Sequence, residues 1–530
     1  MKRVLAVALS LFLMLALAAC GGGSGSVAPE GDDGTSTAAP AGGASEAAPA
    51  GGDEKDTLTW VQGADVTSLD PHVGKETPAV MVTCNIFDTL LGKDENGHPT
   101  PCLAESWESV DELTWTFKLR QDVTFHDGTP MTSADVKFSL ERAIASAFVS
   151  YVVDFIDTVT ADDEYTVTIK TKSPYGPILA NLAVPFTAIV PKAAVEADED
   201  AFVVNPIGTG AFKFVEWKQG DSIKLEANEN YWGGAPATKN LVMRVVPEAA
   251  QRLIALENGE TDLAYEIGPN DLSKVRDHAN LELLEAPSLS VFYLTLNTQN
   301  APFDNVKVRQ AIRYAIDKPL IVDSMLYGSG EPADATIPPA AFGYSARSKV
   351  YDYNLELAKE LMEEAGYADG FTCELSVNDN PTRVEICQVV QSQLKEIGIN
   401  VEIQVLEFGS WIDQLGTGEH EMSFTGWTCS TADADYSYYS LFHSSQTGYP
   451  GNDAFLMDPK VDELVEKGRE SANGDERQAA YDELEEYLGD LTPYTPIYYS
   501  NVNVGASSKV QNFVVDVNGY HRLHGVSVAG

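Results

Sequence analysis

The chain has 530 residues, of which 44% are hydrophobic, so it is long and apolar enough to bury the cores of two or three domains. Its 79 acidic residues outnumber its 35 basic residues and give a formal net charge of −44 at pH 7. A surface of that sign repels phosphate backbones and anionic lipid headgroups. The composition therefore argues against nucleic acid as a partner and against attachment to a membrane by surface charge.

The N-terminal residues have the pattern of an export signal. Residues 1–3 include two basic side chains, and residues 4–19 are almost wholly apolar, but this run is shorter than the roughly 20 residues that a spanning helix needs. It ends in Leu-Ala-Ala-Cys at 17–20, which resembles a bacterial lipobox. We predict a signal peptide over residues 1–19, cleaved before Cys20, and a lipid on Cys20. The alternative is an ordinary secretory signal in which this cysteine is incidental.

Residues 20–55 are predicted to form a flexible tether. They are mostly Gly, Ser, Ala and Pro with a few acids, a composition that cannot bury a core. A flexible chain of this length reaches on the order of 30 Å. Two or more acyl chains on one cysteine give stable anchoring. The expected location is the extracellular face of the cell membrane, in a cell with a single membrane.

Alternating apolar and polar residues predict several strands in the first part of the mature chain. A first strand is expected at 58–61, and a helix is expected over 78–91. A strand at 165–170 follows further along. Between these, an apolar face with a period of two is formed by Leu113, Trp115, Phe117 and Leu119.

A turn and a capped helix follow that strand. Residues 126–128, His-Asp-Gly, predict a turn because glycine accepts a positive φ. Thr132 and Asp135 have the spacing of a capping box, in which each side chain binds a free backbone N–H. The apolar side of the helix is expected to hold Val136, Leu140, Ala143 and Ile144.

The second half of the chain repeats a strand–helix–strand rhythm, which predicts an α/β lobe with some parallel pairing. A helix is expected at 248–258, followed by a turn into a strand at 259–264. The other expected elements are a strand at 292–296, a helix after Asp304, a strand at 371–377, a helix at 383–398, and strands at 399–406 and 494–504.

Two long segments resemble a known family. Residues 125–143, FHDGTPMTSADVKFSLERA, closely resemble the signature region of the extracellular solute-binding proteins that serve peptide and nickel importers. Residues 291–317, VFYLTLNTQNAPFDNVKVRQAIRYAID, form the second match. Residues 205–214 resemble the family's glycine-rich turn, with Ala211 where proline is usual. The chain is thereby identified as a member of bacterial extracellular solute-binding protein family 5, the dipeptide-, oligopeptide- and nickel-binding lipoproteins of ABC importers.

This resemblance implies an α/β, two-lobed periplasmic-binding-protein-like fold of type II and the large cluster, with an extra subdomain inserted in the first lobe. The chain would cross between the lobes near 286–291 and near 491–499. The implied division assigns residues 56–84, 205–288 and 497–530 to the core of the first lobe, 85–204 to the inserted subdomain, and 289–496 to the second lobe.

The resemblance also places the ligand around Gly426 and Trp427. Peptide-binding members carry an aspartate three residues after this tryptophan, and it pairs with the peptide's α-ammonium. A buried cation needs such a hydrogen-bonded anion. This chain has Ser430 at that place. Either Asp433 or Asp435 replaces the missing aspartate, or the solute has no free α-amine.

The remaining candidate ligand residues come from the same resemblance. Phe408 matches an aromatic residue that lines the pocket of oligopeptide binders, and Asn378 and Arg383 fall at lining positions. Tyr498 and Tyr499 lie just past the second crossing and are candidate hinge-side contacts. Trp427 itself is either a ligand contact or an ordinary core aromatic residue.

Cysteine spacing leaves the oxidation state open. An exported protein can form disulfides, and the candidate pairs are Cys84 with Cys102 and Cys373 with Cys387, which leaves Cys429 over. Five buried free thiols are the alternative. The eight histidines are scattered without a metal-binding motif, so we expect no metal site and no cofactor.

The sequence predicts a binding protein and not an enzyme. It contains neither the Gly-x-Ser-x-Gly elbow of hydrolases nor a phosphate-binding Gly-x-x-x-x-Gly-Lys loop. The predicted function is capture of short peptides by closure of two lobes and delivery to an ABC permease, by a monomer. The alternatives are import of nickel or another chelated metal or small solute, a cell-surface lipoprotein for peptide sensing or adhesion, and, least favoured, a secreted hydrolase.

Overall fold

The structure is a computed structural model that describes residues 55–74, 76–94 and 97–530. The predicted signal peptide, Cys20 and nearly all of the predicted tether lie outside these residues. Within the described part of the chain, none of the helices combines the length and the apolar character needed to cross a membrane.

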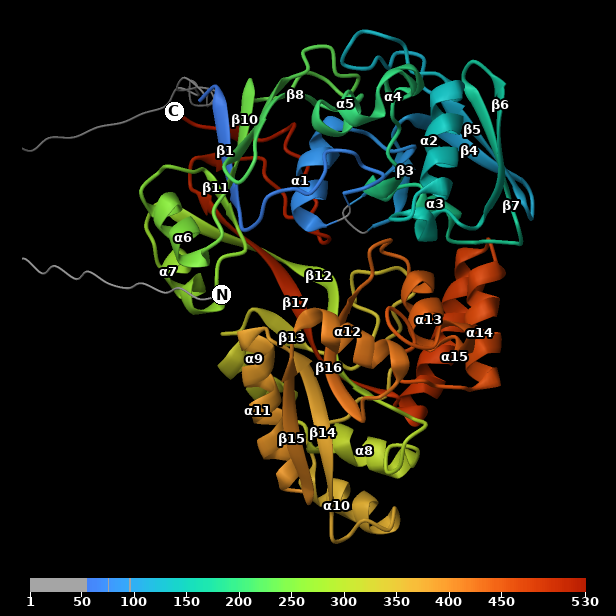
Figure 1. Cartoon of the computed structure of the whole chain (residues 1–530), viewed down its shortest axis with the longest axis vertical. Coiled ribbons are helices and arrows are strands. Elements are labelled where there is room, and N and C mark those ends of the chain that lie inside the picture. The colour runs from blue at the N-terminus through green and yellow to red at the C-terminus, as the bar shows by residue number, and fades with distance from the viewer. Residues whose placement is uncertain (1–54, 75, 95–96) are drawn as a thin grey trace, which may run out of the picture. The chain divides into compact units, whose positions relative to one another are not determined.

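A mixed 11-stranded sheet runs through the described chain (Figure 1). Ten of its strands form one continuous hydrogen-bonded series, and β13 (Gly330–Pro332) pairs with β17 outside this series. The order of the ten is β15 (Ile399–Leu406), β14 (Phe371–Asn378), β16 (Met422–Thr428), β12 (Leu281–Leu296), β17 (Tyr494–Ser507), β11 (Leu263–Tyr265), β1 (Thr57–Gln62), β10 (Asn240–Val245), β9 (Ser222–Ala227) and β8 (Phe212–Lys218).

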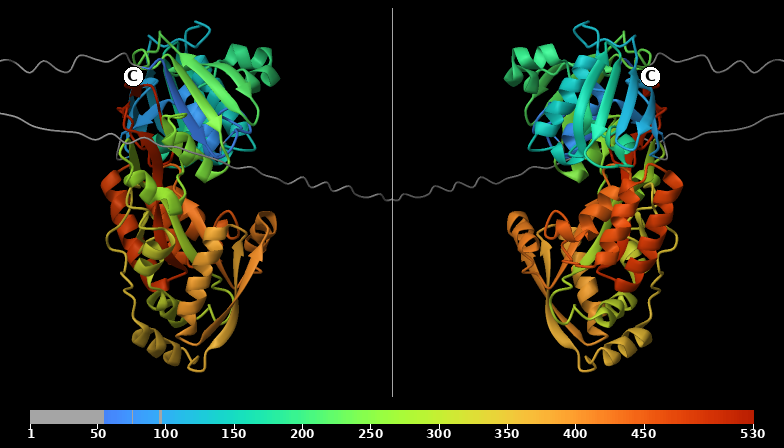
Figure 2. Two further views of the ribbon diagram at one scale, coloured as in Figure 1. Left: turned by 90° about the vertical axis from the view of Figure 1, so that its left-hand side faces the viewer. Right: turned by 90° about the vertical axis from the view of Figure 1, so that its right-hand side faces the viewer.

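Strands β12 and β17 connect the two ends of this sheet. They pair antiparallel over 281–287 with 501–507, and again over 291–295 with 494–499. The register shifts between Pro287 and Val291, so the ladder has an irregularity at its middle. This irregularity lies where the first crossing is predicted, and Tyr499 and Asn501 lie opposite it. In the two side views, segments from blue to green gather in the upper part and yellow to orange segments in the lower part (Figure 2).

A separate four-stranded antiparallel sheet holds the first family-like segment. Its order is β4 (Ala104–Asp111), β5 (Thr114–Leu119), β7 (Thr166–Thr171) and β6 (Ile156–Asp163). Helix α2 (Ser133–Ala145) packs on it, and the predicted capping box of Thr132 and Asp135 is present. The predicted apolar faces meet in one buried cluster that includes Trp115, Phe117, Leu119, Val136, Leu140 and Ala143.

The predicted strand–helix–strand unit of the second half is confirmed. β14 and β15 are parallel neighbours, with Phe371 opposite Ile399, and α11 (Pro381–Lys395) connects them. The other helices around the sheet are α1 (Thr77–Ile86), α6 (Ala249–Glu257), α7 (Leu272–Arg276), α8 (Val306–Ala315), α9 (Lys318–Met325), α10 (Leu355–Glu364), α12 (Phe408–Thr417), α13 (Ala434–Phe442), α14 (Pro459–Glu470) and α15 (Gly474–Leu491). The short elements are β2 (Leu91–Lys93), β3 (Pro99–Pro101), α3 (Ile178–Asn181), α4 (Lys192–Ala197), α5 (Glu199–Val204), β18 (Val510–Gln511) and β19 (Ser527–Val528).

The prediction of a helix over 78–91 is wrong at its C-terminal end. Helix α1 stops at Ile86, and Phe87 is extended, with φ −122° and ψ 152°. The Gly210 N–H donates to the Ile86 carbonyl at 2.8 Å, which satisfies one of the carbonyl groups that a helix end leaves free. A side chain at Gly208 would meet that same carbonyl oxygen at 2.0 Å, so only glycine allows this approach. The glycine-rich turn therefore ends the helix.

Neither candidate disulfide is formed. All five described cysteines are free and buried. The Cys84 sulfur faces the carbonyl groups of Met81 and His521, both at 3.6 Å, and the Cys429 sulfur faces the Asp433 carbonyl at 3.2 Å. The cysteines thus act as small apolar residues of the separate cores.

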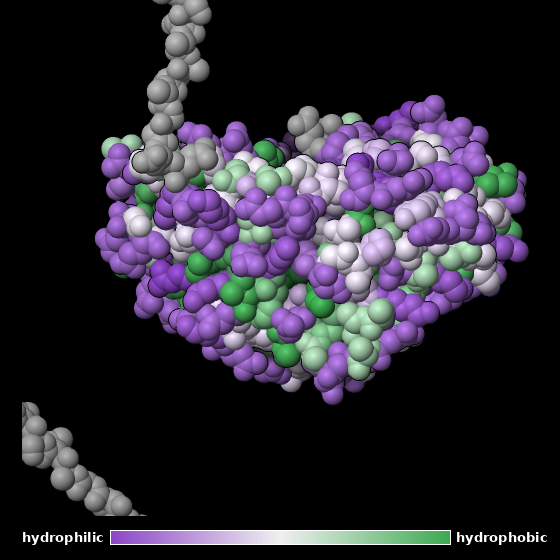
Figure 3. Space-filling model, turned by 90° about the horizontal axis from the view of Figure 1, so that it is seen from above, coloured by the Kyte–Doolittle hydropathy of each residue, from purple (hydrophilic) through white to green (hydrophobic). Residues whose placement is uncertain are grey.

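Seen from above, most of the surface is hydrophilic, and the apolar residues gather mainly in the lower middle of the view (Figure 3). This distribution agrees with the strongly acidic composition.

Candidate functional site

A cavity of about 280 Å³ lies beside the irregularity of β12 and β17. Its walls come from six parts of the chain: the start of α1, the end of β11, each of the two crossing strands, the end of β16 with the residues after it, and the C-terminal residues 517–520. Most of the lining side chains are neutral hydrogen-bonding groups, among them Ser288, Ser290, Thr428, Ser430, Asn501 and Asn503.

The hydroxyl groups on the cavity wall are already ordered by one another. Ser288 Oγ lies 2.8 Å from Ser500 Oγ, and Ser290 Oγ lies 2.7 Å from Thr428 Oγ1. The β12–β16 ladder fixes the second pair, because Ser290 is opposite Thr428 in register. These hydroxyl groups offer both donors and acceptors, which suits a ligand rich in amide groups.

Of the predicted ligand residues, Ser430 lines this cavity. Trp427 lies just before it, half-buried, and its indole N–H donates to Ser437 Oγ at 3.1 Å. Its ring stacks on Tyr436 at 5.3 Å between centroids, and Tyr436 in turn contacts the ring of Tyr151 at 6.2 Å. Trp427 therefore belongs to an aromatic row beside the cavity.

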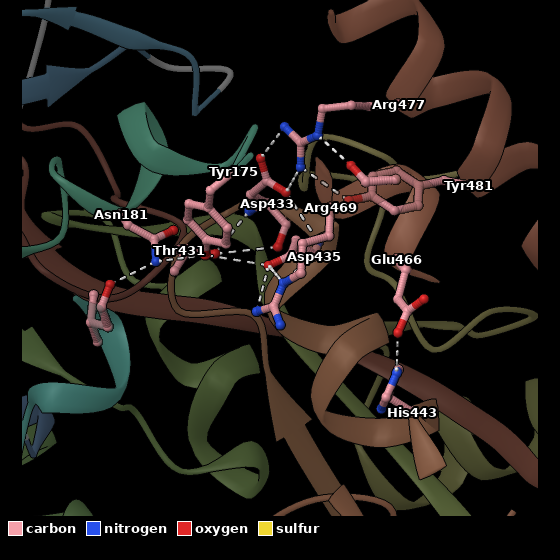
Figure 4. A network of polar contacts seen from close by, with 12 residues as sticks. Tyr175, Asn181, Thr431, Asp433, Asp435, His443, Glu466, Arg469, Arg477 and Tyr481 are labelled. Atoms are coloured by element: carbon pink, nitrogen blue, oxygen red, sulfur yellow. Dashed lines mark hydrogen bonds and ion pairs between the residues drawn. The ribbon is translucent and has the colours of Figure 1, made fainter. Parts of the chain in front are cut away.

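The structure pairs both candidate replacement aspartates with arginines (Figure 4). Asp433 is held by the Arg477 guanidinium, with Nη1 at 2.9 Å and Nη2 at 2.5 Å, and both side chains are buried. Asp435 accepts from Arg469 Nε at 3.1 Å. Burial raises the pKa of the Asp435 carboxyl above its ordinary value, although Arg469 opposes this shift. Each aspartate already has the cationic partner that a ligand ammonium would otherwise supply.

The same group joins the segment after β7 to helices α13 and α14 (Figure 4). The Tyr175 hydroxyl donates to Asp435 Oδ2 at 3.4 Å and accepts from Asn181 Nδ2 at 3.1 Å. Next to it, the Gly176 N–H donates to the Arg469 carbonyl at 2.8 Å. We call this contact between Tyr175, Gly176, Asp435 and Arg469 the latch.

A second hydrogen bond joins the early part of the chain to the segment after β16. Lys93 Nζ, from β2, donates to the Thr431 carbonyl at 2.7 Å, and burial lowers the pKa of Lys93 to about 8. Sequence reasoning found neither this lysine nor Arg469 and Arg477, because their partners lie 34 or more positions away along the chain.

Arg383 and three other predicted residues are placed apart from the cavity lining. Arg383 Nη1 donates to Asn378 Oδ1 at 3.1 Å, and its guanidinium lies over the ring of Phe292 at 5.2 Å. Phe292 stacks on Tyr498 at 4.7 Å. Within the described chain, no carboxylate forms an ion pair with Arg383, and burial lowers its pKa. Phe408 is 49% exposed and contacts Trp411.

Tyr499 has a different environment from its neighbour. Its ring is buried, and its hydroxyl both donates to the Ala335 carbonyl at 3.0 Å and accepts from the Ala335 N–H at 3.1 Å. These two bonds satisfy the hydroxyl group within the fold.

Comparison with known proteins assigns the chain to a family. The profile of the bacterial extracellular solute-binding proteins, family 5 Middle, matches residues 98–449. The chain belongs to this family. It is 32% identical over 468 residues to the glutathione-binding protein GsiB of Shigella dysenteriae, covering 86% of this chain and 91% of that protein.

Solved structures of family 5 proteins agree with the fold. The Helicobacter pylori periplasmic binding protein DppA, in complex with the peptide STSA, is 30% identical with a TM-score of 0.75, covering 89% of this chain and 98% of that one. HbpA2 from Haemophilus parasuis is 28% identical with a TM-score of 0.82, covering 89% and 99%. The predicted two-lobed fold is confirmed, and this family 5 protein is a substrate-binding protein of an ABC importer and not an enzyme.

The described residues contain no group of three or more His, Cys, Asp or Glu side chains able to hold a metal ion.

Proposed function

We propose that this protein captures short peptides, including glutathione, outside the cell and delivers them to the permease of its importer. The observation that carries the proposal is the cavity of about 280 Å³ beside the crossing strands, whose wall is rich in ordered hydroxyl and amide groups. These groups match the donors and acceptors of a peptide backbone. The names of the relatives support the same class of solute, since one binds glutathione and another was solved with a peptide.

The charge that suits the carboxylate of such a solute is Arg383. Its guanidinium is ordered by Asn378 and Phe292 and lacks a carboxylate partner among the described residues. A half-buried guanidinium in this state gains from binding a carboxylate, which it can bind with two parallel hydrogen bonds. In this proposal Tyr498 and Phe292 form the apolar platform beneath that salt bridge, Trp427 and Ser430 border the peptide, and Phe408 contacts a longer ligand.

Closure of two lobes is the proposed capture mechanism. The division proposed for it is the one that the family resemblance implies: residues 56–84, 205–288 and 497–530 for the first lobe, 85–204 for its inserted subdomain, and 289–496 for the second lobe. A solute that contacts both lobes shifts a pre-existing equilibrium toward the closed form. The latch supports this mechanism because it joins the inserted subdomain to the second lobe. A lipid on Cys20 would keep the protein on the outer face of the membrane.

Thermal unfolding with a panel of solutes tests the function. The panel contains glutathione and di-, tri- and tetrapeptides. A ligand at about 100 times its Kd stabilises the folded protein by about 2.7 kcal/mol, which is a visible rise in Tm. If none of these solutes raises the Tm of ligand-free protein, the proposal is wrong.

Arg383→Gln tests the role of the guanidinium, with the exposed Arg347→Gln as its matched control. We expect the first variant to weaken binding of a free-carboxylate peptide at least tenfold and to leave binding of the C-terminal amide unchanged. Equal loss for both peptides would contradict the assigned role.

A further inference from the structure

Glu266 borders two cavities at once. It lines the cavity of about 280 Å³ described above, and also a neighbouring one of about 270 Å³ between the start of α1 and residues 62–64. Its backbone has φ +55°, a left-handed conformation that glycine adopts easily and glutamate rarely. A strained residue of this kind persists only where the surrounding structure holds it.

The backbone around Glu266 is held from two sides. The buried Arg252 donates from Nη2 to the Glu266 carbonyl at 2.7 Å and from Nε to the Tyr265 carbonyl at 2.9 Å. On the other side, the Glu266 N–H donates to the Asn503 carbonyl at 3.2 Å, and the Asn503 side chain accepts from the Ile267 N–H at 2.7 Å. These hydrogen bonds fix the backbone from which the Glu266 side chain extends.

Arg252 is not available as the ionic partner of this carboxylate. Its other two hydrogen bonds go to the carbonyls of Val246 and Pro247, so all four of its bonds are made to backbone oxygens. Among the described residues, no hydrogen bond or ion pair involves the Glu266 carboxylate. Loss of surrounding water raises the pKa of this carboxyl, and the nearby charge of Arg252 only partly opposes the shift.

Apart from Arg252, the residues that line both cavities are neutral, so Glu266 is their one acidic group. Part of the Glu266 side chain is open to solvent, so a ligand that enters the cavities can reach it, and a carboxylate without a cationic partner is stabilised when a ligand brings the cation. We propose that Glu266 binds the ammonium group of the solute and thereby determines specificity for ligands with a free amine. This inference rests on the proposed function, because it names the group of the peptide or glutathione that the site recognises.

The surroundings favour an ammonium over a divalent metal ion. A hard divalent cation takes about six or more oxygen ligands, usually with several carboxylates. Glu266 is the single carboxylate here, and its neighbours in the cavity wall are hydroxyl and amide groups such as Ser290, Ser430 and Asn501. An ammonium has three N–H donors, which one carboxylate and two neutral oxygens satisfy.

The position of Ser430 fits this arrangement. Ser430 lines the same cavity as Glu266, and both Asp433 and Asp435 are already paired with arginines. The anion that the amine needs is therefore supplied by the end of β11 and not by the segment after Trp427.

The test combines a change in the protein with a change in the ligand. Isothermal titration calorimetry measures Kd for glutathione and a dipeptide, each with a free and an N-acetylated amine, on wild type and E266Q. Wild type should bind the free amines at least tenfold more tightly. E266Q should lose at least tenfold for the free amines and bind the acetylated ligands as wild type does, so that the preference disappears. The exposed Glu260→Gln is the matched control and should change neither value.

The opposite results are equally clear. If wild type binds these ligands and E266Q keeps the preference for the free amine, Glu266 is not the amine site while the proposed function stands. If wild type binds none of them, both proposals fail. Should E266Q not fold, E266N is used with the same expectations, because asparagine tolerates the left-handed backbone better.

Discussion

Gly176→Ala should weaken closure of the two lobes, and with it ligand binding, while the protein still folds. The Gly176 N–H bonds to the Arg469 carbonyl, and a Cβ at this position would lie 1.9 Å from the Ser471 carbonyl oxygen and 2.9 Å from Arg477 Cδ. Carbon and carbonyl oxygen atoms that touch without a bond stay about 3.3 Å apart or more. The segment after β7 must therefore move away from the end of α14. Gly176 does not have a positive φ, so alanine fits its backbone once the two surfaces are apart.

The cost follows from the contacts of the latch. Separation breaks the Gly176–Arg469 backbone bond and the Tyr175–Asp435 bond, each worth about 1 kcal/mol. It also removes the Arg469 guanidinium from the Tyr175 ring, a contact of 5.4 Å worth about 0.5 kcal/mol or more. The sum of about 2–3 kcal/mol corresponds to roughly 30–140-fold weaker ligand binding, because each 1.4 kcal/mol is a factor of ten.

Calorimetry with the tightest-binding peptide, or with glutathione, measures this change. Small-angle scattering without ligand should give a larger radius of gyration for the variant than for wild type. Gly474→Ala is the matched control, because a Cβ there has no atom within 4 Å and the φ of Gly474 is not positive. The reasoning is refuted if Gly176→Ala folds and binds with a Kd within threefold of the wild-type value.

Three further predictions concern stability and reactivity. Arg477→Met should lower the free energy of unfolding by about 3–5 kcal/mol, because it leaves the buried Asp433 carboxylate without its cation. Calorimetry should show a Tm lower by several degrees, whereas the control Arg347→Met, at an exposed arginine, should change Tm by less than one degree. His126 accepts from the Gly208 N–H on Nδ1, faces the Gly210 carbonyl with Nε2, and has its pKa lowered to about 4 by burial. The unfolded chain takes up a proton on this histidine near pH 6.5, and the folded protein does not. The contribution of His126 to the free energy of unfolding therefore falls by about 2 kcal/mol between pH 7 and pH 5. Urea titrations should show a smaller loss of stability on acidification for His126→Gln than for wild type, and an equal loss would contradict the assignment. Burial raises the pKa of all five described cysteines, Cys84, Cys102, Cys373, Cys387 and Cys429, to about 12. A thiol reagent should therefore leave them unmodified in native protein and react with all five in denaturant without prior reduction. A reaction that needs a reductant would indicate disulfides.

The local elements were predictable because short-range patterns specify them. The alternation of Trp115, Phe117 and Leu119, and the cap formed by Thr132 and Asp135, depend on neighbours within a few residues. The strand–helix–strand unit of β14, α11 and β15 is likewise periodic over its whole length. The end of α1 was not predictable, because Gly210, more than a hundred positions later, supplies the group that stops it.

The candidate site shows the same limit more strongly. Ser430 could be placed from the resemblance, and it lines the cavity. The pairing of Asp433 with Arg477 could not be foreseen, since each is one of many charged residues and the pair forms only through the packing of α15 against α13 and α14. Glu266 carries no sequence signal, because nothing near it in the chain distinguishes it from the other acids. Its position depends on Arg252 and Asn503, which the fold brings from two other elements.

The hydrogen-bonded pairing of β12 and β17 on both sides of their shared irregularity restricts how the molecule opens. Two strands that keep their ladders at both ends can twist about their common direction, but they cannot slide past one another without breaking many bonds. Under the proposed closure mechanism, opening is therefore a rotation with one preferred axis, whatever solute is released. A permease that docks on both lobes would then meet a molecule whose open and closed faces differ by a single angle.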